Sequence, residues 1–412
     1  MMDALRAIAP PQLLAVYHFT LAFIAALLYR FPSRKIAVVA VTGTKGKSST
    51  IEYLNAIFEN AGVKTALSST IRFKIGDVSK PNTKRMTLPG RFFLQHFLAR
   101  AADDGCAIAF IEMTSEGARQ YRHRFINLDA FIFINLAPEH IESHGSLEAY
   151  ADAKFEIGKQ LVRSRKRPRF LVANADDPAS GRYLTLAIEH ILPFSLSAAN
   201  PFSPGERNGF FTLDGTRIDV RQPGEFSLKN ALAASTLARA MGVPLDKIVT
   251  GIASLTRIPG RAEEIAHEPF SVIVDYAHTP DSLRALYAAY PDRRKICVLG
   301  STGGGRDTWK RPVMGGVADE LCETIILTNE DPYDEDPASI IEAIARGIAT
   351  KQPEIILDRR KAIRRAFELA RASDVVLITG KGTDPTIQGP RGTSEKWSDA
   401  DVAREELQRV RA

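Results

Sequence analysis

The sequence has few cysteines: three among its 412 residues, at positions 106, 297 and 322. Cysteines so few and so widely spaced predict no disulfide framework and indicate a reducing compartment, so we expect a cytoplasmic protein. A chain of this length with 45% hydrophobic residues is long enough to bury two or three cores.

The sequence also lacks a large excess of charge of either sign. Its 54 lysines and arginines against 48 aspartates and glutamates give a net charge of +6. This mild excess suits anionic substrates such as nucleotides and carboxylates, and it is not the pattern of a nucleic-acid-binding protein. The local exception is the basic run at residues 163–169, which we predict to be a solvated loop between a helix and a strand at residues 170–174.

Long apolar runs are scarce as well. One occurs at residues 13–29 and is flanked by Arg30, Arg34 and Lys35. Its length is at the short limit for a membrane span, and it lacks the small-residue cleavage site of a signal peptide. Because it contains His18 and Thr20, we expect a hydrophobic helix within residues 1–35 that docks on the protein or lies at a membrane interface. The prediction therefore includes a peripheral membrane contact through residues 13–29, with a membrane span as the alternative.

A phosphate-binding loop is the first positive signal. Residues 36–41 form a short apolar run that predicts a strand, and a helical pattern follows. Between them lie Gly43, Thr44, Lys45, Gly46, Lys47, Ser48 and Ser49. In such a unit the backbone N–H groups and the helix N-terminus face the anion, Lys47 adds a point charge, and Ser48 can ligate Mg²⁺. The spacing Gly-x-x-Gly-Lys-Ser is shorter than the common form with four intervening residues.

Two further apolar runs end in polar residues that suit the same site. Residues 107–112 end in Glu112, a carboxylate that can anchor the magnesium ion of a nucleotide. Residues 130–134 are followed by Asn135, His140, His144 and Lys154. Because open α/β sheets hold ligands beyond the carboxyl ends of their strands, we expect these side chains near the loop. The two histidines lack a third ligand with suitable spacing, which argues against zinc.

Taken together, these residues resemble the Mur ligase family, the ATP-dependent amide-forming ligases of cell-wall peptide assembly. Residues 43–49 are similar to the family's Gly-Thr-Asn-Gly-Lys-Thr-Thr, with Lys45 in place of the asparagine. Further matches follow in family order at residues 259–263, 275–281, 303–307, 310–312 and 380–382. The sequence looks most like the MurE-type UDP-N-acetylmuramoyl-tripeptide synthetases. Those enzymes have a UDP-binding domain before the loop, and the resemblance implies that this domain is lacking here.

The resemblance implies an α/β fold in three parts. These are an N-terminal hydrophobic helix (residues 1–35), a P-loop-type central ATPase domain (36–256) and a C-terminal Rossmann-like, doubly wound domain (257–412). Apolar runs at residues 272–274, 296–299, 324–327 and 375–378 suit the strands of the second sheet. The Pro- and Gly-rich stretch 201–215 predicts a small β excursion between the two main parts.

The resemblance also implies roles for single residues. Besides the loop residues, the expected ATP contacts are Asn230, Arg261 and Asp275, while Ser227 replaces an asparagine of the family. Two Mg²⁺ ions are expected on Ser48, Glu112, His140 and Lys154. The expected catalytic residues are Lys47, His140 and Lys154. Lys154 is expected to carry a carbamate derived from CO₂, because an unmodified amine would add positive charge to a cationic site.

For the substrates, the resemblance implies an acceptor site at Thr87, Thr114, Gln120 and Arg122. The expected amino-acid site comprises Arg306, Glu330, Asp331, Pro332, Tyr333, Gly380 and Asp384. Tyr333 stands where the diaminopimelate-adding enzymes have the arginine that binds the distal carboxylate, and Asp384 and Thr383 replace a glutamate and a histidine. The lost positive charge favours an amino acid with a cationic or neutral side chain, such as lysine. Alternatively, these acids are solvated loop residues.

We therefore expect an ATP-dependent acid–amino-acid ligase. It would activate a carboxylate as an acyl phosphate and couple it to an amino acid, adding that amino acid to a muramoyl-peptide precursor of peptidoglycan. One alternative is a folylpolyglutamate-synthase-like or amino-acid polymerising ligase. The other is a non-catalytic nucleotide-binding scaffold, against which the intact Lys47, Glu112, His140 and Lys154 speak. The carrier of the acceptor, whether UDP-linked, lipid-linked or another, stays open.

Overall fold

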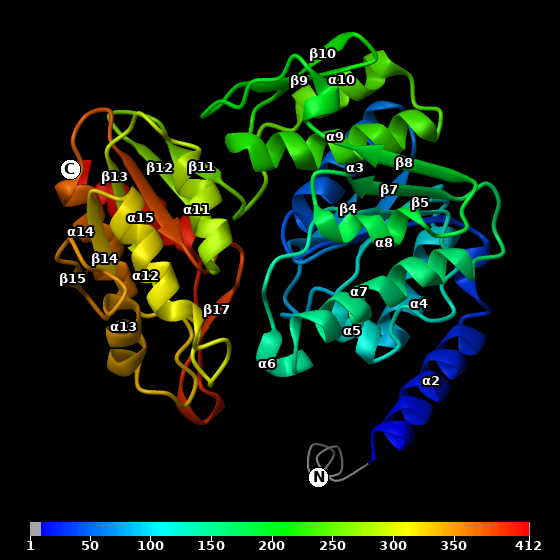
Figure 1. Cartoon of the computed structure of the whole chain (residues 1–412), viewed down its shortest axis with the longest axis horizontal. Helices are drawn as coiled ribbons and strands as arrows, with labels where there is room; N and C mark the ends of the chain where they lie inside the picture. The colour runs from blue at the N-terminus through cyan, green and yellow to red at the C-terminus, as the bar shows by residue number, and fades with distance from the viewer. Residues whose placement is uncertain (1–9, 412) are drawn as a thin grey trace.

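Two β-sheets organise the computed structural model, which describes residues 10–411 (Figure 1). The central sheet has eight strands in the order β4-β3-β2-β5-β1-β6-β7-β8, and all run in the same direction except β3, which is antiparallel to both of its neighbours. Their bounds are β1 Ala37–Thr42, β2 Thr65–Ser68, β3 Arg72–Ile75, β4 Val78–Pro81, β5 Ile108–Glu112, β6 Ala130–Phe133, β7 Phe170–Asn174 and β8 His190–Phe194.

The register of the central sheet brings the predicted polar segments together. Strand β1 is parallel to β5 on one side and β6 on the other, and Val41 pairs with both Glu112 and Ile132. The carboxyl ends of the three strands therefore meet at one edge, and the segments that follow them are neighbours. Each of these segments was expected to contribute to the same site.

Helices cover both faces of the central sheet. One face carries α3 (Lys47–Asn60), α9 (Gly224–Ala240) and α10 (Leu245–Ser254). The other carries α4 (Arg91–Asp103), α7 (Leu147–Val162) and α8 (Gly181–Leu184), and the short helices α5 (Ser115–Arg119) and α6 (Ile141–His144) lie near the strand ends. Val39 and Val41 enter the first core, whereas Val38 and Ala40 enter the second. Burial on both faces explains why β1 is apolar without alternation.

The C-terminal sheet has six strands in the order β11-β12-β16-β13-β14-β15, parallel except for β11. Their bounds are β11 Glu263–Ala266, β12 Ser271–Asp275, β13 Lys295–Leu299, β14 Thr324–Leu327, β15 Glu354–Ile355 and β16 Val375–Thr379. This confirms the four predicted strands.

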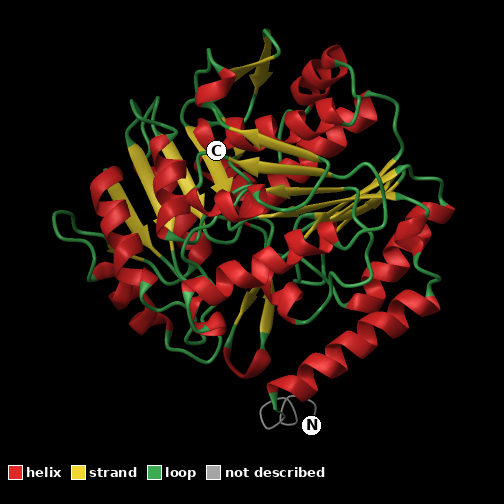
Figure 2. Ribbon diagram, turned by 45° about the vertical axis from the view of Figure 1, so that its right-hand side comes forward, coloured by secondary structure: helices red, strands yellow, loops and turns green. Residues whose placement is uncertain are grey.

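Helices also enclose this second sheet, as Figure 2 shows. One face carries α11 (Pro280–Ala288), α12 (Lys310–Leu321) and α13 (Pro337–Ala345), and the other carries α14 (Arg359–Leu369) and α15 (Asp399–Arg411). The predicted doubly wound arrangement is confirmed. Two hairpins lie outside the sheets: β9 (Gly209–Leu213) with β10 (Thr216–Val220), and β17 (Thr386–Gln388) with β18 (Ser394–Lys396). The first is the small β excursion, shifted slightly beyond its predicted range.

Helix α2 (Pro11–Leu28) lies at an edge of the central part beside α4 (Figure 1). Ala22, Ala25 and Ala26 of this helix are buried. Over residues 10–411, the structure contains no helix that is both long enough and apolar enough to cross a membrane. Residues 1–9 of the predicted N-terminal segment lie outside the described residues.

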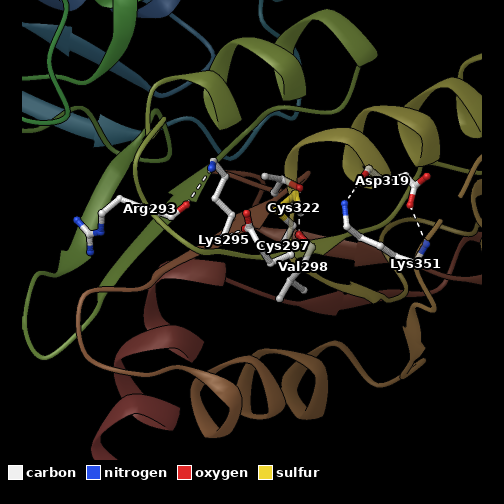
Figure 3. The surroundings of a disulfide bond; sticks show 9 residues. Arg293, Lys295, Cys297, Val298, Asp319, Cys322 and Lys351 are labelled. Atoms are coloured by element: carbon white, nitrogen blue, oxygen red, sulfur yellow. Dashed lines mark hydrogen bonds between the residues drawn. A yellow bond between two sulfur atoms is a disulfide. The ribbon is translucent and has the colours of Figure 1, made fainter.

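The expectation that the cysteines form no disulfide is wrong for one pair. Cys297 of β13 and Cys322, at the end of α12, are bonded in the C-terminal core (Figure 3). The parallel pairing of β13 with β14 places Ile296 opposite Thr324, so the residue two positions before β14 comes beside β13. A separation of 25 residues hides this proximity in the sequence. Cys106 is buried and free.

The basic run at residues 163–169 is a loop, as predicted, between α7 and β7. Several of its charges form ion pairs within the protein. Lys166 pairs with Asp129 at 2.6 Å, and Arg169 pairs with Glu189 at 2.8 Å. These ion pairs give the run a structural role in joining the helix to the sheet.

Candidate active site

A cavity of about 920 Å³ lies between the central and C-terminal sheets. Its polar lining includes Lys45, Asn174, Asp177, Asn230, Arg261 and Asp275. Its apolar lining includes Phe226, Leu286, Ala289 and Pro291, from both parts of the chain. A space of this size, with a phosphate-binding loop at one end and an apolar wall at the other, suits a nucleotide.

The phosphate-binding loop is fixed by the segment after β6 and by α9. The side chain of Asn135 accepts a hydrogen bond from the Lys45 backbone N–H at 2.9 Å and donates one to the Lys45 carbonyl at 3.2 Å. Gly46 has φ +86°, and a Cβ there would lie 2.2 Å from Oδ1 of Asn230. Only glycine fits such a position, so the loop and Asn230, a predicted ATP contact, lie in direct apposition.

Two lysine amines converge on one carbonyl of this loop. Nζ of Lys47 lies 2.9 Å from the Gly43 carbonyl oxygen, and Nζ of Lys154 lies 2.8 Å from the same atom. Lys154 is only 2% exposed. Burial, together with the positive charge of Lys47, lowers the pKa of Lys154 well below that of an ordinary lysine. The neutral, nucleophilic form of this amine is therefore more accessible than in an exposed lysine.

Glu112 is fully buried and is held by Thr70, a residue that the sequence did not single out. The Thr70 backbone N–H donates to Oε1 of Glu112 at 3.1 Å, and the Thr70 hydroxyl donates to Oε2 at 2.9 Å. The same hydroxyl lies 2.9 Å from the hydroxyl of Thr87. This relay connects the predicted magnesium carboxylate to a predicted acceptor residue.

His140 lies in a loop that contacts the C-terminal part. Its backbone N–H donates to Oδ2 of Asp307 at 3.0 Å. In return, the backbone N–H groups of Asp307 and Thr308 donate to the carboxylate of Glu142. We call these reciprocal bonds between residues 140–142 and 307–308 the interdomain clasp. Burial lowers the pKa of His140, which favours the neutral imidazole that a metal ion requires.

A buried carboxylate, Glu139, joins the two parts beside this clasp. Its Oε1 lies 2.8 Å from Nζ of Lys45 and 3.1 Å from Nε2 of His278. Burial alone would raise the pKa of Glu139, but the charge of Lys45 and the hydrogen bond with His278 outweigh burial and hold it well below its usual range. Burial and Lys45 lower the pKa of His278 to about 4. Glu139 was not predicted, and its position next to His140 was the available signal.

Two residues of the C-terminal part were expected to reach the nucleotide. The guanidinium of Arg261 stacks over Tyr276 at 4.6 Å from the ring centre and lies 3.5 Å from the Ser48 hydroxyl. Both carboxylate oxygens of Asp275 accept backbone N–H bonds, from Ala262 and Ala277, each at 2.6 Å. Asp275 lines the cavity and also fixes the turn that presents Arg261.

The predicted amino-acid residues gather on three loops of the C-terminal part. Arg306 is exposed, and its guanidinium lies 5.3 Å from the centre of the Tyr333 ring. Glu330 is buried: its Oε1 accepts from the Thr302 hydroxyl at 2.8 Å, and its Oε2 has no hydrogen-bond partner. A Cβ at Gly380 would lie 2.4 Å from that oxygen, so Gly380 leaves it room. Burial raises the pKa of Glu330.

Other acids of the predicted loop are already paired. Nζ of Lys381 lies 2.7 Å from Asp331 and 2.9 Å from Asp384. Asp331 also accepts a hydrogen bond from the Gln388 backbone N–H at 2.7 Å. The Pro332 carbonyl leaves no room for a Cβ at Gly303. Asp331 and Pro332 therefore hold the loop in place. Oδ1 of Asp384, like Oε2 of Glu330, is buried without a partner.

The predicted acceptor residues lie together near α5. The Thr114 hydroxyl accepts the Gly117 backbone N–H at 3.1 Å and so caps this helix. The Arg122 guanidinium donates to Oε1 of Gln120 at 2.7 Å and to the Leu88 carbonyl, next to Thr87. Leu88 and Thr87 belong to the loop that reaches Thr70, so all four predicted residues border one region beside Glu112.

The predicted magnesium ligands approach the loop from different elements. Within the part of the chain that the structure describes, no three His, Cys, Asp or Glu side chains are grouped closely enough to hold a metal ion. The hydroxyl of Ser48 and the carboxylate of Glu112 are nevertheless donors that Mg²⁺ prefers, and phosphate oxygens complete such sites. The Lys154 amine is not a magnesium donor unless it is modified.

Comparisons with known proteins agree with this geometry. The model of the Mur ligase middle domain matches residues 41–238, and that of the Mur ligase glutamate ligase domain matches residues 260–382. The chain belongs to the Mur ligase family. It is an ATP-dependent acid–amino-acid ligase, and the nucleotide-sized cavity lies where the two matched segments meet.

Relatives of this Mur ligase cover most of its length. The UDP-N-acetylmuramyl-tripeptide synthetase of Roseiflexus sp. is 36% identical over 420 residues, which cover 94% of this chain and 81% of the relative. A solved UDP-N-acetylmuramoyl-L-alanyl-D-glutamate–2,6-diaminopimelate ligase is 27% identical, with a TM-score of 0.62 over 92% of this chain and 79% of the other. The Mycobacterium tuberculosis folylpolyglutamate synthase with ADP has a TM-score of 0.71 over 91% and 93% of the two chains, at 17% identity, and shares the fold.

Proposed function

We propose that this Mur ligase adds an amino acid to a muramoyl-peptide precursor of cell-wall peptidoglycan. One observation carries the proposal: a phosphate-binding loop with two converging lysine amines borders the interdomain cavity, and Glu330, a buried carboxylate with one unpaired oxygen, lies in the C-terminal part. This arrangement supports binding of a nucleotide at the loop and of an amino acid near the carboxylate.

The chemistry requires that a carboxylate become reactive before an amine attacks it. A carboxylate oxygen of the acceptor bonds to the γ-phosphorus of ATP, the bond between that phosphorus and the β–γ bridging oxygen breaks, and ADP leaves. The amino nitrogen then attacks the acyl carbon, and inorganic phosphate and a proton are released. Lys47 supplies positive charge to the phosphoryl oxygens. Ser48, Glu112, His140 and carbamylated Lys154 would hold two magnesium ions, which would supply further charge neutralisation.

Lys154 is proposed to act as a carbamate. Its neutral Nζ attacks the carbon of CO₂, an N–C bond forms, and a proton leaves to solvent. The modification places an anion beside the positive charges of Lys45 and Lys47, which stabilise it, and creates an oxygen ligand. The low pKa and the burial of Lys154 support this proposal.

The proposed amino-acid substrate follows from the charges of the residues around its site. We propose that Arg306 binds the α-carboxylate of the amino acid as a bidentate donor. The unpaired oxygens of Glu330 and Asp384 suit a cationic side-chain group, and Tyr333 offers no positive partner for a distal carboxylate. An amino acid such as lysine is therefore proposed. Thr87, Thr114, Gln120 and Arg122 are proposed to bind the acceptor.

The proposal also covers the organisation and the location of the protein. The hydrophobic helix within residues 1–35, the central domain (36–256) and the C-terminal domain (257–412) are proposed as separate parts. The protein is proposed to be cytoplasmic, with a peripheral membrane contact through residues 13–29. Helix α2 and its exposed apolar side chains support that contact.

An ADP-release screen with the purified full chain tests the proposed reaction. The acceptors are UDP-linked muramoyl dipeptide and folate monoglutamate, and each is combined with lysine, diaminopimelate or glutamate. We expect release of ADP, matched by amide product, with the muramoyl acceptor and lysine. Turnover only with folate and glutamate would support the folylpolyglutamate alternative. ATP binding without turnover for any pair would support the scaffold alternative.

A further inference from the structure

Helix α2 exposes an unusually wide apolar surface. Eight large hydrophobic side chains on it are exposed: Leu13, Val16, Tyr17, Phe19, Phe23, Ile24, Leu27 and Leu28, with Leu13 and Val16 each at 61% and Leu28 at 64%. At 3.6 residues per turn these positions spread over about half of the helix circumference. We call these eight side chains the α2 surface.

The opposite side of α2 is fixed to the protein. Ala22, Ala25 and Ala26 are buried where α2 packs on α4. The rings of Phe19 and Phe23, at the border of the surface, contact Phe125 with ring centres 5.1 and 5.4 Å apart. The helix is therefore held in one orientation, and its apolar half points away from the protein.

The charges on and next to α2 indicate which kind of partner the α2 surface fits. Residues 11–28 contain no Asp, Glu, Lys or Arg. Directly after the helix come three exposed cations, Arg30, Arg34 and Lys35, and within residues 10–411 the structure gives none of them an ion pair. Asp103, at the end of α4, is the acid that lines the small hollow beside Arg30 and Lys35. An apolar face with unpaired cations at one end matches the acyl region and the anionic headgroups of a lipid layer.

The width of the surface also argues against a single partner helix. A helix–helix seam covers a narrow stripe, whereas a helix lying in a membrane interface buries a broad apolar face. We infer that the α2 surface docks this ligase on an anionic lipid bilayer, with α2 parallel to the bilayer plane. The inference rests on the proposed membrane contact and not on the ligase chemistry.

Docking at this place brings the proposed acceptor site near the lipid. Arg91 of α4 donates to the carbonyl of Gln120 at 2.9 Å, and the same nitrogen lies 2.8 Å from Nδ1 of His18 on α2. Phe19 also contacts Tyr121. Figure 1 shows α2 on the side of the central part that faces away from the C-terminal sheet, so a bilayer there leaves the interdomain cavity accessible.

Vesicle co-sedimentation of the full chain tests this inference. We expect binding to vesicles that contain phosphatidylglycerol, little binding to pure phosphatidylcholine vesicles, and release in about 1 M salt because the Debye length falls to about 3 Å. Ile24→Glu should reduce partitioning at least about tenfold because it puts a charge in the apolar face. The pair Arg30→Glu and Lys35→Glu should reduce it by a similar factor.

Ile355→Glu is the matched control, since Ile355 is 55% exposed on β15 in the C-terminal sheet. It should bind vesicles like the unmodified protein, and all variants should keep their unfolding temperature and their ADP release with soluble substrates. Failure of the unmodified chain to bind anionic vesicles would overturn the inference. Concentration-dependent self-association that Ile24→Glu abolishes, without vesicle binding, would assign the surface to a second copy instead. Either result leaves the ADP-release test of the ligase reaction unaffected.

Discussion

The phosphate end and the proposed amino-acid end of the active site differ in charge and in construction. At the phosphate end, the amines of Lys47 and Lys154 lie on one carbonyl of a loop that is continuous in sequence. At the amino-acid end, acids predominate and come from loops around residues 302–307, 330–333 and 380–384. The cationic end is suited to a phosphate chain, and the acidic end to an ammonium group. The comparison teaches that local sequence builds the first, while the packing of separate loops builds the second.

The largest expected effect is at the phosphate end. Lys154→Ala should lower the rate of amide formation by at least about 100-fold while ATP still binds, because the proposed carbamate is lost. Small carboxylic acids should restore part of the activity, and labelled CO₂ should mark Lys154 in the unmodified protein above the lowered pKa of its amine. Lys159→Ala, at a half-exposed position of the same helix where the amine pairs with Glu156, is the control. Full activity of Lys154→Ala would remove the catalytic assignment.

The second-largest effect is expected at the interdomain clasp. Glu142→Ala removes an acceptor for the backbone N–H groups of Asp307 and Thr308, so the Arg306 loop and the His140 loop should align less often. We expect kcat to fall by about threefold to tenfold, in the range of the net contribution of one ordinary hydrogen bond, with a smaller change in the KM for ATP. Glu148→Ala, at an exposed position nearby, should leave kinetics unchanged. A loss confined to the KM for ATP would contradict this role.

At the amino-acid end, Glu330→Gln should weaken amino-acid binding, raising its KM about tenfold if Glu330 meets an ammonium group. The same change should stabilise the free protein. The pKa of Glu330 is raised above the ordinary 4.5 by burial, so the ionised form costs stability at pH values above the pKa of the unfolded chain. The gain in unfolding temperature should therefore be present at neutral pH and vanish in acid. Glu395→Gln, at an exposed position, should show neither effect.

The smallest expected effect is a change of preference. Tyr333→Arg adds a positive partner to the acidic end and should shift the ratio of kcat/KM toward an amino acid with a distal carboxylate, by a factor of about ten. Tyr333→Phe, which keeps the ring under Arg306, should leave the ratio unchanged. The same profile in all three proteins would mean that this loop does not discriminate side chains.

How far the sequence could be interpreted depended on how local each feature is. The strand ends, the glycine-lysine loop and the second set of strands were predictable, because buried parallel strands are continuous apolar runs and phosphate loops are continuous motifs. Thr70, Glu139 and the clasp were missed because their partners lie far away in the sequence: 42 residues separate Thr70 from Glu112, and 167 separate His140 from Asp307. The disulfide was missed for the same reason.

The sequence by itself determined the α/β fold, the phosphate-binding loop and the family of this ligase, because each depends on contiguous residues. Tertiary structure alone decided which charged groups are already paired. Asp331 is bound to Lys381, whereas Glu330, its neighbour in the chain, has a buried oxygen without a partner. Likewise, packing on α4 decided which half of α2 is covered. Such outcomes depend on contacts between side chains that are far apart in the sequence, and the sequence pattern does not reveal those contacts.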